Sequence, residues 1–336
     1  MPHGNDTIVL VSSRPAGRAA RQGWGSIPAM LSPRMARVLR AIGIGIGVIS
    51  VVALGYGLVF WHASHAFPGD TLTYYLAGTR LNEGHHLYDL GADDVWLYAH
   101  PEFPLYGPPL VAVIWRPLAA IPGGWGMIIW LVAMNYCALT AIFWTLLGTR
   151  GWAGVLVIVL VPSLTLLMGV GNVDAAVLLG IIVVWTLVAA ERPKAAGILV
   201  GVLASLKLTP AIFLIWFIAR REWTAVGWTV ATGLVLAAVA VIGTEPGIWV
   251  RYARVIVEGS AAGRPGALII LAAGIAALFV VRSPRTSFAL ATVLIPLGSP
   301  VAAGHSWSIE LAATAPFLRP FRRRTAAPSA DDGERG

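Results

Sequence analysis

Residues 68–118 of this 336-residue chain read PGDTLTYYLAGTRLNEGHHLYDLGADDVWLYAHPEFPLYGPPLVAVIWRPL, and they interrupt a sequence that is otherwise dominated by apolar runs. The stretch carries six acidic residues and three histidines, and His62 and His65 come shortly before it. A polar and aromatic segment between apolar runs indicates a loop outside the bilayer, where a polar substrate can be handled. Asp70 is its first carboxylate, and we expect the chemistry to begin there.

The composition is that of a membrane protein. Hydrophobic residues make up 57% of the chain and charged residues 12%, and the mean hydropathy is +0.75, whereas soluble domains carry about 25% charged residues. Apolar runs of about 17–25 residues have the length of transmembrane helices. The predicted fold class is therefore all-α and polytopic, with about ten transmembrane helices.

The net charge of +8 does not require a nucleic-acid partner. Basic residues gather at the cytoplasmic ends of membrane spans, and this preference accounts for most of the arginines. We therefore expect membrane lipids, and no nucleic acid, around the chain. The single cysteine, Cys137, excludes an intramolecular disulfide and lies in an apolar run.

The basic linkers also orient the spans. A first span at 38–61 follows Arg34, Arg37 and Arg40, and it predicts that the 62–121 loop faces outside, with 108–121 along the membrane surface. A rival topology has 108–121 cross the bilayer and 195–219 form one span, which puts Arg150, Arg192 and Lys194 outside against the basic-residue bias. The later apolar runs lie at 124–147, 152–169, 173–190, 195–206, 208–219, 223–243, 266–281, 286–302 and 306–318.

This topology divides the chain into three parts. Residues 1–36 are predicted to be a disordered basic cytoplasmic tail, 37–320 a transmembrane domain containing the 62–121 extracytoplasmic loop, and 321–336 a second disordered cytoplasmic tail. The predicted location is the cell inner (plasma) membrane, with several passes and the active site facing outside.

Asp70 has two interpretations. The run Gly-Asp-Thr-Leu-Thr-Tyr is typical of a helix start with Asp as its N-cap, which needs no function. A carboxylate at the mouth of a membrane domain can also serve as a general base. Tyr74 lies one turn further on and would share the same face of the helix.

The later polar residues interrupt the apolar runs at helix breaks. Lys207 precedes Pro210 and suits a phosphate at the lipid boundary, although a residue at a helix end can also snorkel to the interface. Asn172 and Asp174 either line a cavity or cap the span that follows them. His305 comes after a Ser-Pro pair and could bond a phosphate or hydroxyl; a structural role is equally compatible with the sequence.

Metal and nucleotide sites have no support in the sequence. The loop histidines lack the spacing of known metal motifs, so solvated histidines are expected. No phosphate-binding glycine loop, dinucleotide fingerprint or serine-hydrolase elbow occurs. We therefore expect no metal and no cofactor.

At these residues the chain resembles the integral-membrane GT-C glycosyltransferases, and within them glycosyltransferase family 87. The resemblance rests on short elements of the loop and on later helix breaks. These elements are Asp70-x-x-x-Tyr74, Leu87-Tyr88, Tyr106-Gly107-Pro108-Pro109-Leu110, Arg116-Pro117-Leu118-Ala119, Gly197 to Lys207 with Pro210, and Ser299-Pro300 with His305. Two elements depart from the family pattern: Gly171-Asn172-Val173-Asp174 stands where G-Q-x-N is usual, and 301–305 lacks the tryptophan and paired histidines.

The resemblance implies a GT-C-like bundle whose large first extracytoplasmic loop carries interfacial helices. It also implies an inverting transfer of a sugar from a polyprenyl-phosphate donor to a glycolipid or cell-wall glycan acceptor, with mannose as the favoured sugar. Asp70 would be the general base; Lys207, His305 and Tyr74 would bind the donor or its phosphate; and Tyr106, Asn172 and Asp174 would contact the acceptor or line the cavity.

Three alternatives stay open at the level of sequence. An arabinofuranosyltransferase using decaprenyl-phosphate arabinose would show the same residues. A transporter would place charges near the middle of the membrane. An inactive paralogue serving as an assembly partner would explain the altered motifs.

Overall fold

The computed structural model describes residues 69–88, 105, 107–148, 152–261, 266–299 and 304–318, together with scattered positions between 37 and 64. Every regular element in these residues is a helix, so the predicted all-α class is confirmed for this part of the chain. The predicted tails at 1–36 and 321–336 and the site candidate Tyr106 lie outside the described residues.

Most of the helices follow the apolar runs, whereas the helices at 69–82 and 248–261 lie outside them. The elements are α2 (Gly69–Asn82), α4 (Pro109–Ala119), η2 (Pro122–Gly124), α5 (Trp125–Gly148), α6 (Trp152–Val159), α7 (Val161–Val170), α8 (Asp174–Ala189), α9 (Pro193–Leu206), η3 (Thr209–Ala211), α10 (Ile212–Arg220), α11 (Trp223–Gly243), α12 (Ile248–Ala261), α13 (Ala267–Val280), α14 (Pro284–Leu297) and η4 (Gly304–Phe317).

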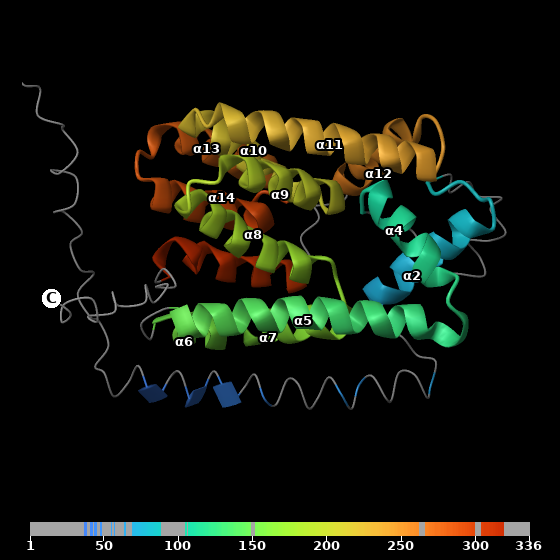
Figure 1. Ribbon diagram of the computed structural model, residues 1–336, viewed down its shortest axis with the longest axis horizontal. Coiled ribbons are helices and arrows are strands. Elements are labelled where there is room, and N and C mark those ends of the chain that lie inside the picture. Colours follow the sequence, from blue (N-terminus) through green and yellow to red (C-terminus); the bar gives the residue numbers. More distant parts are fainter. Residues whose placement is uncertain are drawn as a thin grey trace, which may run out of the picture.

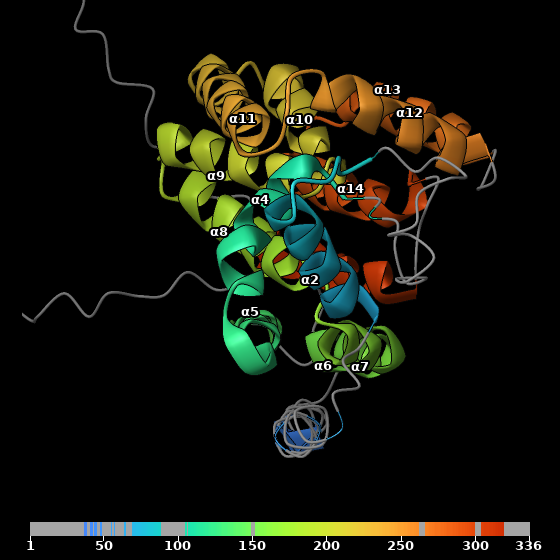
Figure 2. The ribbon, with the colours of Figure 1, turned by 90° about the vertical axis from the view of Figure 1, so that its right-hand side faces the viewer.

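The helices are arranged as two packed rows with a cap at one end. Helices α11, α9, α8 and α5 contact one another in this order, and η4, α14, α10 and α13 form a second row that meets the first through α8 and η4 (Figure 2). Helices α2, α4 and α12 gather at one end of the longer helices (Figure 1). The two described helices of the stretch 68–118, α2 and α4, therefore contribute to a cap over the bundle.

Two of the described helices are long and apolar enough to cross a membrane. They are Pro122–Gly148, which joins η2 to α5, and Trp223–Gly243, which is α11. The pair α7 and α8 would be a third crossing, but it is bent by 118° and has the form of a broken span or a re-entrant loop. Helices α4, α9 and α13 and the segment Thr209–Arg220 are apolar but shorter. The total of about ten spans stays a prediction.

Helix α9 is held against α11 by a close backbone contact near its start. A Cβ atom on Gly197 would lie 2.3 Å from the carbonyl oxygen of Ala225, and the Thr229 hydroxyl donates to the Gly197 carbonyl at 3.1 Å. The helix stops at Lys207, whose backbone is extended at φ −150° and ψ 128°. Pro210 then starts the next turn within η3, because proline suits the first turn of a helix.

Candidate active site

A cavity of about 740 Å³ lies where the α2, α4 and α12 cap meets the bundle. Most of its wall is apolar and comes from α10, α12, α13 and α14, while its polar side chains come from α2, the α7–α8 bend, the end of α9 and the start of η4. Five of the predicted site residues line this one space: Asp70, Tyr74, Asn172, Lys207 and His305.

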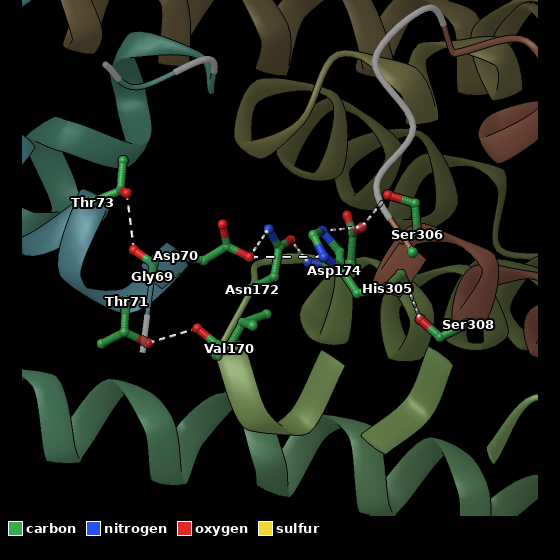
Figure 3. A network of polar contacts seen from close by, with 12 residues as sticks. Gly69, Asp70, Thr71, Thr73, Val170, Asn172, Asp174, His305, Ser306 and Ser308 are labelled. Atoms are coloured by element: carbon green, nitrogen blue, oxygen red, sulfur yellow. Dashed lines mark hydrogen bonds and ion pairs between the residues drawn. The ribbon is translucent and has the colours of Figure 1, made fainter. Parts of the chain in front are cut away.

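Asp70 stands in the first turn of α2 and directs its carboxylate into the cavity (Figure 3). The Asn172 amide donates to its Oδ2 atom at 3.0 Å, and the side chain is 33% exposed. The backbone beneath it is fixed because the Thr71 hydroxyl donates to the Val170 carbonyl at 2.9 Å. Helix α2 is thereby attached to the end of α7, and a carboxylate at its N-terminal end is favoured by the helix dipole.

The bend between α7 and α8 presents two side chains to the site. Gly171 takes a left-handed backbone at φ 65°, and its carbonyl accepts the indole N–H of Trp130 at 2.7 Å. Asn172 accepts the backbone N–H of Asp174 on Oδ1 at 2.8 Å, which leaves its amide nitrogen to donate to Asp70. The bend therefore aims Asn172 at the base candidate and begins α8 at Asp174.

Asp174 is a fully buried carboxylate behind the cavity wall. Its Oδ1 lies 2.5 Å from the Lys207 ammonium nitrogen, and its Oδ2 accepts the Ser306 hydroxyl at 3.0 Å. Helix α8 begins at Asp174 with Val173 as its N-cap, so the carboxylate of Asp174 does not serve as the cap of this helix. It is the counter-ion of the lysine.

Lys207 is consequently not an isolated cation. Its side chain is 23% exposed, and besides Asp174 its ammonium contacts the Ser306 hydroxyl at 3.4 Å. An ammonium has three N–H donors, so one remains for a group in the cavity. The sequence predicted Lys207 as a site residue but did not predict Ser306. The only indication for Ser306 in the sequence is that it directly follows His305.

His305 lies between the two carboxylates. Its Nδ1 is 3.8 Å from Asp70 Oδ2 and its Nε2 is 3.6 Å from Asp174 Oδ2, distances that are electrostatic contacts and slightly too long for hydrogen bonds. Its backbone carbonyl accepts the Ser163 hydroxyl at 3.1 Å and the Ser308 hydroxyl at 2.6 Å. Helices α7 and η4 thus fix the backbone of His305, and its imidazole lies between the base candidate and the ion pair.

Tyr74 is buried beneath Asp70 in an aromatic cluster. Its ring centroid lies 6.4 Å from that of Trp115 and 5.7 Å from that of Trp130. Burial, reinforced by the carboxylates of Asp70 and Asp174, raises the pKa of the Tyr74 phenol well above its usual range. The phenol therefore stays neutral and acts only as a hydrogen-bonding group and as part of the wall.

The apolar side of the cavity is lined by aliphatic side chains of three helices. They include Ile212 and Ile215 of α10, Leu268 and Leu271 of α13, and Leu294 of α14. A space with one apolar side and a few convergent polar groups accommodates a ligand that is itself amphipathic. Among the residues that the structure describes, no three His, Cys, Asp or Glu side chains are grouped as metal ligands.

Residues 105–263 match the model of glycosyltransferase family 87. The predicted resemblance to this family is therefore confirmed over these residues. The matched segment extends from just before α4 through α12 and includes Asn172, Asp174 and Lys207.

A second comparison gives a relative whose name states its sugar donor. The chain is 29% identical to a polyprenol-phosphate-mannose-dependent α-(1-2)-phosphatidylinositol pentamannoside mannosyltransferase of Mycolicibacterium smegmatis, over 44% of this chain and 40% of the relative. The aligned part of the chain thus spans about 40% of the length of that relative. No solved structure matches the chain.

Proposed function

We propose that this protein is an inverting glycosyltransferase that moves a sugar from a polyprenyl-phosphate donor to a glycan or glycolipid acceptor on the extracytoplasmic face. Mannose is the favoured sugar. The observation that carries the proposal is that an accessible carboxylate, Asp70, and a cationic group, Lys207, line the same largely apolar cavity. The relative's dependence on polyprenol-phosphate mannose supports the choice of donor.

The two sides of the cavity suit the two parts of such a donor. The aliphatic wall of α10, α13 and α14 fits an isoprenoid chain, and Lys207 and His305 stand where the phosphate would follow. Since the lipid carries the sugar and the phosphate together, the reaction needs no nucleotide site.

Asp70 is suited to remove the acceptor proton. Its Oδ2 is occupied by the Asn172 amide, while Oδ1 has no hydrogen bond among the described residues and is available for an acceptor hydroxyl. The acceptor oxygen attacks the anomeric carbon, its proton passes to Oδ1, and the bond from that carbon to the phosphate oxygen breaks. Attack from the face opposite the phosphate inverts the configuration at the anomeric carbon.

Lys207 is suited to stabilise the leaving group. The Asp174–Lys207 pair is neutral overall, and a phosphodiester donor adds one negative charge. As the sugar leaves, the lipid phosphate becomes a monoester whose charge rises toward about −2. The ammonium therefore interacts more strongly with the transition state than with the bound donor, which is the condition for electrostatic catalysis.

The donor is tested by offering radiolabelled polyprenyl-phosphate mannose and polyprenyl-phosphate arabinose in parallel to membranes that contain the protein. We expect label to pass to an acceptor from the mannose donor, and membranes without the protein provide the control. Transfer from the arabinose donor alone would establish the arabinofuranosyltransferase alternative. Transfer from neither donor, by a protein that is inserted and folded, would overturn the proposal.

The orientation is tested at the two ends of the segment formed by η3 and α10. In a Cys137→Ala background, Leu208→Cys is expected to react with a membrane-impermeant thiol reagent on intact cells, because Leu208 is 54% exposed beside the cavity. The matched variant Glu222→Cys, at the exposed junction of α10 and α11, is expected to react only after permeabilisation. The reverse labelling pattern would place the cavity on the cytoplasmic side.

A further inference from the structure

Thr209 lies on the cavity wall two residues after Lys207. Its hydroxyl oxygen is buried and has no hydrogen-bond partner among the described residues. Leaving such a hydroxyl unpaired is unfavourable, so each instance in a native fold needs an explanation. On the wall of a binding cavity, a bound polar group is the direct explanation.

Three threonines within helices show how such a hydroxyl is usually satisfied. The hydroxyls of Thr186, Thr229 and Thr292 each donate to the carbonyl four residues earlier in their own helices, at 3.0, 2.8 and 3.0 Å. Thr209 begins η3, and the extended backbone of Lys207 separates it from α9. The carbonyl that would satisfy it in a continuous helix is therefore not in place.

The position of Thr209 indicates which group would bind there. Lys207 is the cation of the cavity, and its remaining N–H is directed to a ligand as argued above. A compact ammonium attracts phosphate without fixing its direction, whereas a hydroxyl donates along one direction. A rotation about χ1 moves the hydroxyl of Thr209 to another staggered position, so the oxygen can turn to the cavity without moving the backbone.

We propose that Thr209 is a phosphate-binding residue whose hydroxyl donates to an oxygen of the lipid phosphate held by Lys207. This inference deepens the proposed function and rests on its polyprenyl-phosphate donor. The Lys-Leu-Thr-Pro segment would then bind phosphate through its first and third side chains, while Pro210 fixes the turn.

The test measures binding without sugar transfer. The purified protein in detergent is titrated with farnesyl phosphate, with farnesol and with inorganic phosphate, for the wild type, Thr209→Val and Thr209→Ser. Thr209→Val keeps the shape of the side chain and removes the donor, and Thr209→Ser keeps the donor. Thr186→Val is the matched control, since Thr186 lies on α8 and is not among the cavity-lining residues.

We expect Thr209→Val to weaken farnesyl phosphate binding about tenfold, the effect of losing one hydrogen bond to a charged group. Thr209→Ser should stay within about threefold of the wild type, Thr186→Val should equal it, and farnesol binding should not change in any variant. Unchanged farnesyl phosphate binding by Thr209→Val would overturn the assignment, as would an equal loss for farnesol or a wild type that does not distinguish farnesyl phosphate from farnesol.

Inorganic phosphate distinguishes the source of the phosphate group. If inorganic phosphate binds weakly and farnesyl phosphate binds tightly, the site binds a lipid phosphate. Equal affinities for the two ligands would overturn the assignment to a lipid phosphate. The outcome is independent of the transfer assay. A protein that binds farnesyl phosphate in a Thr209-dependent way and yet transfers no sugar is a distinct result. That result would overturn the proposed function but retain Thr209 as a phosphate-binding residue.

Discussion

Asp70→Asn is expected to reduce kcat for sugar transfer by about 10²–10⁴-fold, the contribution typical of a general base. The asparagine still offers a carbonyl oxygen to the Asn172 amide, so the contact at 3.0 Å is preserved, but it cannot take up a proton. The measurement is transfer from radiolabelled polyprenyl-phosphate mannose under saturating donor.

The control for this variant is Glu83→Gln, which neutralises an exposed carboxylate just beyond the end of α2. It should transfer sugar at the wild-type rate. Equal melting temperatures in detergent for wild type and Asp70→Asn would show that the fold survives. An Asp70→Asn protein with undiminished kcat would exclude Asp70 as the base.

Lys207→Met is expected to destabilise the fold as well as weaken donor binding. The change leaves the carboxylate of Asp174, which is fully buried, without its counter-ion, and breaking a buried ion pair in this way costs about 3–5 kcal/mol. The melting temperature in detergent should therefore fall clearly below that of the wild type.

A double variant separates the two effects. Lys207→Met with Asp174→Asn removes the unpaired charge, so the melting temperature should recover most of the loss, while the KM for the donor stays high because the phosphate still lacks its cation. Lys194→Met is the matched control, because Lys194 is the only other lysine and its ammonium lies over the Trp228 ring at 4.5 Å, away from the site. Its loss should cost only about 0.5–1 kcal/mol.

Two results would contradict this account. A single Lys207→Met variant as stable as the wild type would mean that the Asp174–Lys207 pair contributes nothing to the fold. A double variant with a wild-type KM for the donor would remove Lys207 from the phosphate site.

The sequence predicted the helices well because apolar runs and breakers are local signals. The end of α9 at Lys207 and the start of η3 near Pro210 follow directly from the proline, which disfavours helix in the preceding residues. The number of membrane crossings does not follow in the same way. Helices such as α9 and α13 are shorter than a full span, and periodicity alone does not tell how deep a short helix sits.

The candidate site was predictable as a set of residue types, but the pairing among its members was not. Asp70, Lys207 and His305 each break an apolar pattern and were visible one at a time. Asp174 had two local interpretations, as a cap or as a cavity residue, and neither predicts its contact with Lys207, 33 positions away, or with Ser306, 132 positions away. Such pairs arise from packing between helices, and a single sequence carries no local signal for them.

The bend after α7 has a consequence for how the protein tolerates its surroundings. Asn172, which holds Asp70, and Asp174, which holds Lys207, are separated by a single residue and are joined by the bond from the Asp174 N–H to Asn172. One short piece of backbone therefore sets the spacing between Asp70, the proposed base, and Lys207, the proposed phosphate-binding residue. The surrounding helices can tilt as bilayer thickness varies. The distance between the Asp70 carboxylate and the Lys207 ammonium is nevertheless expected to stay constant.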